Sequence, residues 1–390
     1  MNSPRVLFYV QHLLGIGHLV RAARIAKALA ESGFDTRLVL GGTEVPGLDA
    51  GAARIVQLPP VRMGEGGFHA LAHADGTAFD AEAQGQRRTQ LLDVFDRFAP
   101  DILVIEAFPF GRRQMRFELL PLLERARARA TPPLIATSIR DILQANRRPE
   151  RIAETLQHVE RDFDLVLVHG DPALARLEDS FPESVEFASK AVYTGLVAPP
   201  PPPEPTSQHA AYDVVVSAGG GAVGAPLLRA ALGARRSTRL AARPWLLLTG
   251  PNMPPALRAE LANGAEPGVT IEPFVPNLAA VLRRARLSVS QAGYNTVADV
   301  LVAGPRSVLV PYATDGETEQ SVRARHLDAM GLAVCLNESE LAPDTLARAI
   351  DRALESRPPA HALCLDGAAN TARVLWSVLE RRGTTDPESR

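Results

Sequence analysis

The chain has 390 residues, of which 46% are hydrophobic and 22% charged, and its formal net charge is −2 at pH 7. This length exceeds what one hydrophobic core usually organises, so we expect two domains, and the small net charge argues against nucleic acid as a partner. The two cysteines are too few for a disulfide framework or a zinc site. No apolar run is long enough to cross a membrane and the N-terminus is too polar for a signal peptide, so we expect a cytoplasmic protein.

Strand-like and helix-like segments alternate along the first half of the chain. Residues 19–31 place apolar side chains at helical spacing, and short apolar runs predict strands between such helices. The predicted strands are 6–10, 36–40, 102–105, 134–137 and 165–169. Alternating strands and helices build a parallel sheet with helices on both faces. Residues 1–196 therefore predict one doubly wound domain.

A proline-rich linker, residues 197–211, follows this domain. Consecutive prolines adopt an extended, semi-rigid conformation that joins neither helix nor sheet. The alternation then restarts with predicted strands 214–217, 245–249, 269–272, 287–290 and 307–310, so residues 212–364 predict a second doubly wound domain. Residues 365–390 predict a C-terminal helix that can pack back on the first domain, and a tail. The expected fold class is α/β, with two Rossmann-like domains facing a cleft.

A glycine-rich turn follows the first strand of each domain. The second turn contains G-x-G-x-x-G from Gly219, which is the pattern of dinucleotide-binding loops. Nicotinamide binding also needs an acidic residue about twenty positions later, and residues 237–248 contain none. The residues Gly219, Gly220 and Gly221 therefore favour a diphosphate cradle, with a purely structural turn as the alternative.

Residues 288–331 read as strand, glycine turn, helix, strand and acidic loop. Gly293 permits the sharp turn, and the start of the following helix offers unpaired N–H groups to an anion. The acidic residues Asp299, Glu317 and Glu319 suit sugar hydroxyls, which donate to carboxylates. Phosphate and polyol together indicate a nucleotide or nucleotide-sugar; an ordinary βαβ crossover is the alternative.

Candidate catalytic residues lie at the predicted strand ends of the first domain. His18 opens the first helix and titrates near neutrality, so it is the candidate general base, with a capping or packing histidine as the alternative. Glu106 is the candidate carboxylate that orients it, with a salt bridge as the alternative, and Asp141 is the competitor. His12 and His169 also lie near strand ends and are expected to be lining or structural residues.

Two further charged patterns favour ordinary structural explanations. Asp162-Phe163-Asp164 matches a D-x-D metal motif but precedes a strand, where its carboxylates would lie away from a site at the carboxyl ends, so we expect no metal site. The arginine run 112–129 could meet a phosphorylated acceptor or an anionic membrane surface. A solvated helix face, with Glu118 and Glu124 interspersed, is the favoured interpretation.

The second half resembles the donor domain of the GT-B glycosyltransferases, closest to the enzymes that add N-acetylglucosamine to form lipid II. The matches run in order from Gly219–Gly221, through 274–278 and 293–299, to Glu319-Gln320; the first half resembles the acceptor domain mainly at residues 15–18. By this resemblance, the glycines hold the diphosphate, 274–278 reads the uracil edge, Asp299 holds the ribose and Glu319-Gln320 hold the sugar. The implied nucleotide-sugar residues are Gly17, Gly219, Gly220, Gly221, Phe274, Val275, Gln291, Gly293, Asn295, Thr296, Asp299, Glu319 and Gln320.

Departures from the family pattern leave the sugar open. Gly221 stands where the family usually has serine, and the loop 311–320 is longer and carries Asp315 and Glu317. Glu319 stands where the family often has glutamine or aspartate. Because these positions surround the expected sugar, the donor sugar need not be N-acetylglucosamine.

The resemblance implies an inverting, metal-independent glycosyltransferase that uses a nucleotide-diphospho-sugar, expected to be UDP-linked, as a co-substrate and needs no other cofactor. The alternatives are a sugar-nucleotide epimerase of the same fold and a non-catalytic nucleotide-sugar binding protein. The acceptor is open, with phosphorylated and membrane-associated acceptors both compatible, and the oligomeric state is undetermined. A bacterial, cytoplasmic protein is expected, with peripheral attachment to the inner membrane as an option.

Overall fold

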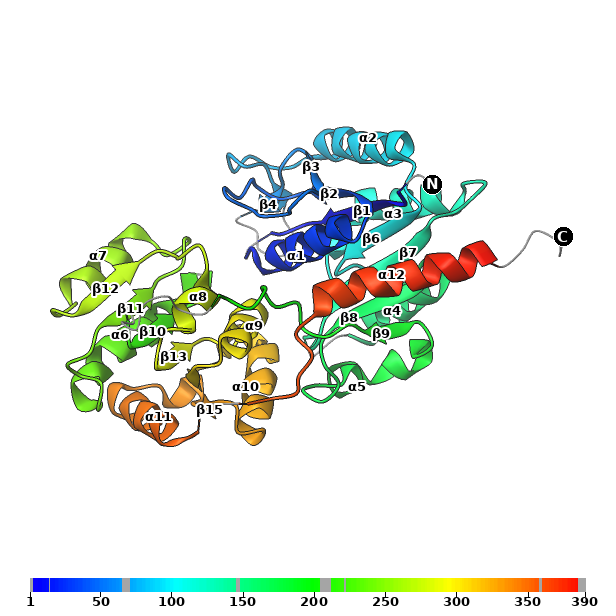
Figure 1. Ribbon diagram of the computed structural model, residues 1–390. Coiled ribbons are helices and arrows are strands. Elements are labelled where there is room, and N and C mark those ends of the chain that lie inside the picture. Colours follow the sequence, from blue (N-terminus) through cyan, green and yellow to red (C-terminus); the bar gives the residue numbers. More distant parts are fainter. Residues whose placement is uncertain are drawn as a thin grey trace. The chain divides into compact units, whose positions relative to one another are not determined.

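The computed structural model describes residues 3–13, 15–64, 71–144, 148–203, 212–220, 222–357 and 360–384. It divides the chain into two compact units. The first unit contains Met1–Pro172, Arg176–Val197 and Asp366–Arg390, and the second contains Ala173–Ala175 and Ala198–Leu365. Each unit is built on its own parallel sheet (Figure 1).

The first unit contains a seven-stranded parallel sheet in the order β3-β2-β1-β6-β7-β8-β9. Its central strands are almost wholly buried because helices cover both faces. The strands are β1 (Arg5–Val10), β2 (Asp35–Leu40), β3 (Arg54–Gln57), β6 (Ile102–Glu106), β7 (Leu134–Arg140), β8 (Leu165–His169) and β9 (Ala191–Tyr193). A separate antiparallel pair joins β4 (Arg62–Met63) to β5 (Leu71–Ala72).

Side chains that alternate along each strand divide the first core between the two faces of the sheet. Leu7 and Tyr9 of β1 share one cluster with apolar residues of α2 and α3, and the alternate residues Val6 and Phe8 are buried on the opposite face. The helices of this unit are α1 (Gly17–Glu31), α2 (Ala81–Phe98), α3 (Arg116–Arg127), α4 (Pro149–Asp162), α5 (Leu177–Ser180) and α12 (Gly367–Thr384).

The last helix of the chain, α12, belongs to the first unit and lies beside α1 (Figure 1). The Trp376 indole Nε1 donates to the Ser32 carbonyl at 3.0 Å, and its ring lies 4.7 Å from that of Phe34. At its start, a side chain on Gly367 would meet the Gly195 carbonyl oxygen at 2.3 Å, so only glycine fits there. These contacts fix α12 on the first unit.

The second unit contains a six-stranded parallel sheet in the order β12-β11-β10-β13-β14-β15. Its strands are β10 (Val214–Ser217), β11 (Trp245–Leu248), β12 (Val269–Glu272), β13 (Leu287–Ser290), β14 (Arg306–Leu309) and β15 (Val334–Cys335). Its helices are α6 (Ala225–Ala234), α7 (Pro255–Asn263), α8 (Leu278–Leu282), α9 (Tyr294–Ala303), α10 (Glu319–Ala329) and α11 (Pro343–Glu355). Strand order reverses beside β10, which is where ligands bind in sheets of this kind.

The ten strands predicted from the sequence are confirmed, nearly all within one residue at each end. One boundary is wrong: the strand predicted at 134–137 does not end there, because β7 continues to Arg140, with Ser138 beside Glu106 and Arg140 beside His169. The strands β3, β9 and β15 escaped prediction because they are short edge strands with few buried residues. Helix α1 begins at Gly17, two residues earlier than predicted.

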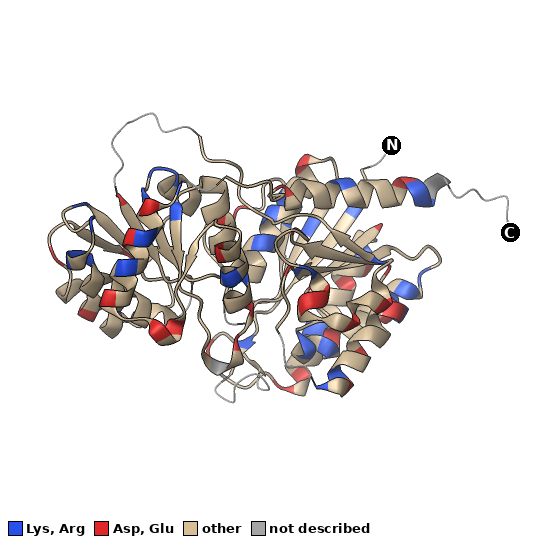
Figure 2. Cartoon of the chain, turned by 90° about the horizontal axis from the view of Figure 1, so that it is seen from below, with Lys and Arg blue, Asp and Glu red and all other residues tan. Residues whose placement is uncertain are grey.

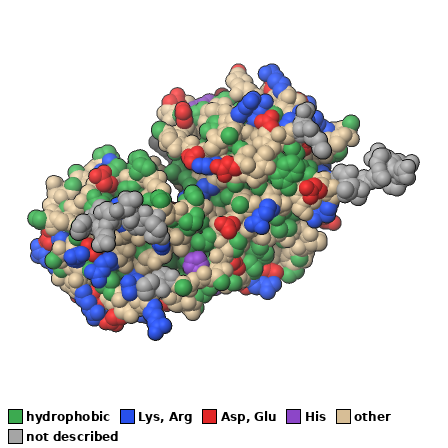
Figure 3. Space-filling model, in the orientation of Figure 1, with side chains coloured by type: hydrophobic (Ala, Val, Ile, Leu, Met, Phe, Trp, Pro, Cys, Tyr) green, Lys and Arg blue, Asp and Glu red, His purple; other side chains and the backbone are tan. Residues whose placement is uncertain are grey.

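Charged side chains of both signs alternate over the surface. Figure 2 shows basic and acidic residues side by side along the helices, and Figure 3 shows the same mixture on the face it presents. In the described part of the chain, every helix is too short or too polar to reach across a bilayer.

Candidate functional site

The pair of His18 and Glu106 lies at the carboxyl edge of the first sheet. His18 is the second residue of α1, which directly follows the loop after β1, and Glu106 is the last residue of the neighbouring strand β6. The His18 Nδ1 lies 2.8 Å from a Glu106 carboxylate oxygen. Glu106 is fully buried, whereas the His18 side chain remains 21% exposed. The structure thus joins the candidate base to the first of the two candidate carboxylates.

Arg21 and Ser138 complete the surroundings of the Glu106 carboxylate. Arg21, one turn after His18 on α1, forms an ion pair with the same oxygen, and the Ser138 hydroxyl donates to the other oxygen at 2.5 Å. Burial alone would raise the pKa of Glu106, but Arg21, His18 and Ser138 outweigh it and lower that pKa to about 2. Glu106 is therefore ionised near neutral pH and can only accept hydrogen bonds.

The ionised carboxylate determines which nitrogen of His18 carries the proton. Because Glu106 has no proton to give, the 2.8 Å contact requires Nδ1–H as the donor, which leaves the lone pair on Nε2. The Arg21 guanidinium lies 3.2 Å from the same nitrogen but can only donate, so in this tautomer it makes no hydrogen bond to Nδ1. Within the described residues, no group hydrogen-bonds to Nε2. Burial, with a contribution from Arg112, lowers the pKa of His18 to about 3, so its imidazole is neutral at pH 7 and can accept a proton.

Arg112, which helps to lower the pKa of His18, belongs to the arginine run for which the sequence pattern favours a solvated helix face. Its Nε donates to the Gln11 carbonyl at 2.6 Å, directly after β1. Arg112 and Ala107 both have left-handed backbone conformations, with φ of 59° and 67°, in the loop between β6 and α3. Residues other than glycine rarely adopt this backbone conformation, and such strain concentrates at functional sites. The loop holds a guanidinium close enough to influence both His12 and His18.

Asp141 and the D-x-D residues have other surroundings. Asp141 is fully buried directly after β7, where it lies against Gly170 at the end of β8. Asp162 ends α4 and pairs with His158 and Arg161, and Asp164 accepts from the Ile135 amide and pairs with Arg127. Among the described residues, no three or more histidine, cysteine or acidic side chains gather in a way that could hold a metal ion.

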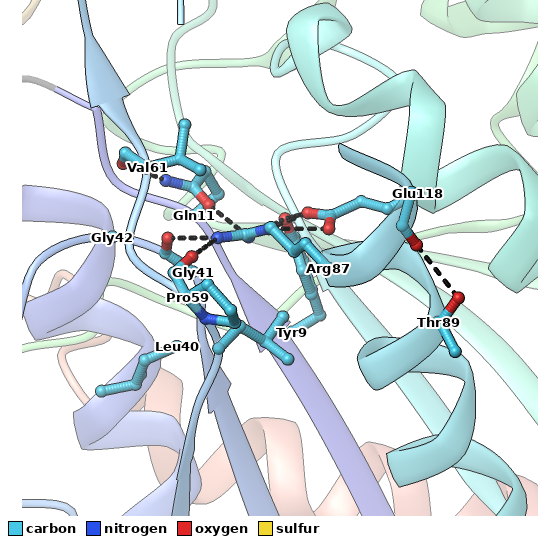
Figure 4. Close-up of polar contacts among 12 residues, drawn as sticks. Tyr9, Gln11, Leu40, Gly41, Gly42, Pro59, Val61, Arg87, Thr89 and Glu118 are labelled. Carbon is cyan, nitrogen blue, oxygen red and sulfur yellow. Dashed lines mark hydrogen bonds and ion pairs between the residues drawn. The ribbon is translucent and has the colours of Figure 1, made fainter. Parts of the chain in front are cut away.

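A buried cluster around Arg87 supports the loops at this edge of the sheet (Figure 4). Arg87 and Glu118 are both fully buried and form an ion pair at 2.8 Å, so the prediction that Glu118 is solvated is wrong. Arg87 also donates to the Gly41 carbonyl after β2 and to the Gln11 side chain after β1, at 2.7 and 2.8 Å. Gln11 in turn donates to the His12 carbonyl at 2.8 Å. The cluster therefore fixes the loop that precedes His18.

In the second unit, three loops meet at the carboxyl edge of the sheet around the glycine turn. Gly219 has φ of +68°, and a side chain there would come within 3.3 Å of the Gln291 side chain. Gly250 has no room for a side chain, because a Cβ added there would lie 2.5 Å from the Gly219 carbonyl oxygen. The Asn252 side chain donates to the Gly220 carbonyl at 2.9 Å. The predicted residue Gly221 lies outside the described residues. Sequence analysis missed Gly250 and Asn252, although a Gly-Pro-Asn run after a predicted strand signals such a turn.

Helix α9 presents its N-terminus at the same edge. Gly293 is the N-cap, no side chain of a described residue caps the helix, and its first turn contains no acidic residue. Asn295 and Thr296, both in that turn, are half-buried, and Asp299 follows one turn later with 8% exposure. Uncapped N–H groups and a positive helix end suit an anion such as a diphosphate.

The other predicted donor residues lie after β12 and β14. Phe274 is 61% exposed and Val275 is half-buried, while Asn277 caps α8 by accepting from the Ala280 amide at 3.0 Å. An exposed phenylalanine at the carboxyl edge of a sheet offers an apolar surface to a flat base.

Glu319 and Gln320 have partners inside the protein. Glu319 is 2% exposed and pairs at 2.7 Å with Arg323, one turn later on α10, which is fully buried and donates to the Ala292 carbonyl. The Gln320 side chain accepts from the Tyr312 amide, and the Glu317 carboxylate accepts from the Glu319 amide at 2.9 Å. Sequence analysis missed Arg323, although its i,i+4 spacing from Glu319 is the signal for such a pair.

Comparison with known proteins identifies relatives of the second unit. Residues 214–364 match the glycosyltransferase family 28 C-terminal domain. The second unit thus resembles the C-terminal domain of family 28 glycosyltransferases. Curated relatives include two proteins named UDP-N-acetylglucosamine–N-acetylmuramyl-(pentapeptide) pyrophosphoryl-undecaprenol N-acetylglucosamine transferase. The one from Syntrophotalea carbinolica is 33% identical over a match that covers 30% of this chain and 35% of the relative. The one from Xanthomonas axonopodis pv. citri is 36% identical over a match that covers 30% of this chain and 27% of the relative. The chain thus spans about a third of the length of these relatives.

Solved structures match nearly the whole chain. The calicheamicin glycosyltransferase CalG4 aligns with a TM-score of 0.64 and 17% identity over 99% of this chain and all of that one. MurG from Acinetobacter baumannii aligns with a TM-score of 0.56 and 17% identity over 96% of this chain and all of that one. These matches confirm the predicted α/β class and the GT-B fold of two Rossmann-like domains.

Proposed function

We propose that the protein is an inverting glycosyltransferase that moves a sugar from a nucleotide-diphospho-sugar, most simply a UDP-sugar, to an acceptor hydroxyl. The observation that carries the proposal is the neutral His18 imidazole, oriented by a buried ionised Glu106, in a chain whose second unit matches the family 28 domain. Inverting transfer needs one base for the acceptor proton and stabilisation of the leaving diphosphate. The two units offer one each.

The first unit supplies the base. The acceptor hydroxyl gives its proton to His18 Nε2 as its oxygen bonds to the anomeric carbon and the bond from that carbon to the diphosphate breaks. The imidazole then carries a positive charge, which the ionised Glu106 at 2.8 Å stabilises. Asp141 stays the competing base in this proposal, because it too is buried at the carboxyl edge of the sheet.

The second unit binds the nucleotide-sugar. Backbone N–H groups of the glycine turn and of the α9 N-terminus receive the diphosphate, and Asp299 accepts from the ribose hydroxyls. Phe274 and Val275 lie along the base. Glu319 is buried against Arg323, so only the part of its carboxylate that Arg323 does not occupy can contact the sugar. Gln320 supplies the neighbouring polar group.

Charge on the leaving diphosphate is stabilised by these backbone groups, so the proposed reaction needs no metal. Transfer should therefore continue in excess EDTA. Complete loss of activity that magnesium or manganese restores would contradict this part of the proposal and return attention to Asp162 and Asp164.

The same proposal includes an acceptor that is phosphorylated or membrane-associated. The enzyme would then work in the cytoplasm, attached peripherally to the inner membrane. Support comes from the curated relatives, whose names specify a pyrophosphoryl-undecaprenol acceptor. Their match covers only about a third of each relative, so the acceptor itself is best found by experiment.

In the decisive experiment, UDP- and TDP-sugars are first ranked by the thermal shift they cause, because a bound ligand stabilises the folded state. The full chain is then incubated with each of these sugars. Release of the nucleoside diphosphate, by transfer or slow hydrolysis, supports a transferase. An isomerised nucleotide-sugar would instead identify an epimerase, and an unchanged bound ligand would identify a binding protein. His18→Ala is the matched control, because it should stop release and leave the thermal shift intact.

A further inference from the structure

A line of polar side chains runs through the interior of the first unit, from His18 away along the carboxyl edge of the sheet. Its members come from consecutive positions in the strand order β1-β6-β7-β8-β9. Glu106 ends β6, Ser138 lies on β7, His169 ends β8 and Thr194 directly follows β9. Each neighbouring pair is hydrogen-bonded, so the line is continuous over five strand positions.

All distances along the line are within hydrogen-bonding range, and the one between Ser138 and Glu106 is short. Ser138 Oγ lies 2.5 Å from a Glu106 oxygen, His169 Nε2 lies 2.9 Å from Ser138 Oγ, and Thr194 Oγ1 lies 2.8 Å from His169 Nδ1. The last four members are at most 1% exposed. Burying polar groups costs free energy unless each finds a partner, and apolar side chains would fill the same space. A hydrophobic core therefore does not require this arrangement.

The proton positions along the line follow from one end. Glu106 is ionised, so Ser138 must donate its hydroxyl hydrogen to the carboxylate. The Ser138 oxygen can then only accept from His169, which places the His169 proton on Nε2. His169 Nδ1 is left as an acceptor and takes the hydroxyl hydrogen of Thr194, whose distances to nearby carbonyls, 3.3 and 3.4 Å, are longer. All three hydrogen bonds point toward Glu106.

The far end of the line is anchored to the last helix. The Asn370 side chain on α12 donates to the Thr194 carbonyl at 2.7 Å, and Gly367 packs against Gly195. Burial lowers the pKa of His169 to about 3, so this imidazole is neutral and keeps a single proton. The line therefore has one direction and no mobile charge of its own.

We propose that Ser138, His169 and Thr194 are positioning residues for the reaction proposed above: their directed hydrogen bonds occupy one oxygen of Glu106 and aim the other at His18, which fixes His18 with its proton on Nδ1 and its lone pair on Nε2. Without this line, the Glu106 carboxylate could rotate or be shared differently with Arg21, and His18 could carry its proton on Nε2. In that tautomer the nitrogen needed as a base is blocked.

The inference can be tested on the full chain without any substrate. Nitrogen-15 NMR of labelled histidines distinguishes the two tautomers, and His18→Ala and His169→Gln assign the signals. In the unmodified protein, His18 should carry its proton on Nδ1 and His169 on Nε2. Ser138→Ala and Thr194→Val should both move His18 toward a mixture of tautomers.

Thr137→Val is the matched control. Thr137 is the neighbour of Ser138 on β7 and is also fully buried, and its hydroxyl has no hydrogen-bond partner among the described residues. Its substitution removes a buried hydroxyl from the same strand without touching the line, so the His18 signals should not change. Thr194→Val keeps the inference testable if Ser138→Ala fails to fold.

Activity provides the second measurement. Ser138→Ala should lower the turnover number by about tenfold to a hundredfold, the range typical of groups that orient a functional side chain, with unchanged KM for the nucleotide-sugar. An unaltered His18 tautomer in Ser138→Ala and Thr194→Val would overturn the inference, as would equal losses of turnover in Ser138→Ala and Thr137→Val. A shifted tautomer together with no transfer from any nucleotide-sugar would uphold the positioning role and refute the proposed function.

Discussion

The candidate sites of the two units lie at the carboxyl edge of similar parallel sheets but consist of different chemical groups. In the first unit the site consists of buried charged and polar side chains, with Glu106 fully buried and Arg21 2% exposed. In the second it consists of glycine turns, an uncapped helix start and short polar side chains. One sheet edge holds fixed charges, and the other offers backbone groups and space.

This difference follows from what each site is proposed to do. A proton is moved at a defined atom only if the base has a fixed tautomer and a fixed charge beside it, which requires buried partners. A diphosphate brings its own charge, so the protein needs only N–H groups and room for close approach. The same fold therefore serves two kinds of chemistry through its loops.

The largest effect is expected from His18→Ala. Loss of a general base should lower the turnover number about 10²–10⁴-fold. The affinity for UDP, measured by calorimetry, should stay nearly the same, because the nucleotide is proposed to bind the other unit. Glu106→Gln should cause a smaller loss, since the amide can still contact His18 but no longer stabilises its charged form.

The order of these losses is the sharper test. If Glu106→Gln or Asp141→Asn abolishes transfer while His18→Ala keeps most of it, a carboxylate is the base. The first unit would then work by a different residue from the one its geometry favours.

The second prediction concerns close approach at the glycine turn. Apart from its chain neighbours, Gly220 has no described residue within 4 Å of the position of an added side chain, so Gly220→Val should leave the fold intact. If the diphosphate lies against this turn, the valine should weaken UDP binding by about tenfold or more, or about 1.4 kcal/mol. Calorimetry with UDP measures the affinity.

Gly304→Ala is its matched control. Gly304 ends α9 with φ of +73° and also has open space around it, so alanine there should cost about 1 kcal/mol of stability through backbone strain alone. UDP affinity should not change. Unaltered affinity in Gly220→Val would place the diphosphate elsewhere.

The third prediction uses pH to separate Arg112 from its neighbours. His18 acts as a base when neutral, so the rate should fall as pH drops through its pKa, which burial and Arg112 hold at about 3. Arg112→Gln should raise that pKa and shift the acid limb of the rate profile to higher pH. Arg113→Gln, one residue away and paired with Glu154, should leave the limb in place. Equal profiles for all three proteins would show that Arg112 does not act on His18.

The fourth prediction compares the stability of the two units in acid. In the first unit, the pKa values of His18 and His169 are about 3, below their ordinary value of 6.5, and that of Glu106 is about 2. The unfolded chain therefore binds protons first, so the histidine contribution to stability is lost as pH falls from 6.5 toward 3 and the Glu106 contribution from 4.5 toward 2. In the second unit, the carboxylates with lowered pKa, Glu260 and Glu266, belong to exposed surface pairs.

The chain's two tryptophans allow each unit to be followed. Trp376 packs on the first unit and Trp245 lies in the core of the second. Between pH 7 and pH 5, the urea midpoint reported by Trp376 should fall more than that reported by Trp245, which can be read alone in Trp376→Phe. A larger fall at Trp245 would contradict the distribution of buried histidines described above.

Much of this organisation could be predicted from the sequence. Buried strands of parallel sheets are short apolar runs, so ten of the strands can be located from the sequence, whereas the short edge strands β3, β9 and β15 cannot. His18 and Glu106 can be brought together because both are expected at carboxyl strand ends. The sequence did not decide between Glu106 and Asp141, because proximity at one edge does not specify which carboxylate points at the imidazole.

The missed residues share a physical cause. Arg21, Ser138 and Arg112 act through partners far away in the chain, and their types are common on surfaces and strands. Ser138 lies just beyond the strand predicted at 134–137, so the pattern does not place it beside Glu106. Glu319 was expected to face a ligand, and its burial against Arg323 depends on how α10 packs. Side-chain partnerships across distant segments depend on packing, which local patterns do not encode.

The position of α12 has a consequence for the order in which the protein can be completed. The ribosome must synthesise the 168 residues of Ala198–Leu365 before the helix that covers Ser32 and Phe34 exists. At ~5–20 residues per second this delay lasts roughly 10–30 s, and at its end the second unit has its whole chain while α12 is still to be made. The half that begins first is therefore finished last, and a premature stop before Gly367 would damage the N-terminal unit and leave the C-terminal one entire.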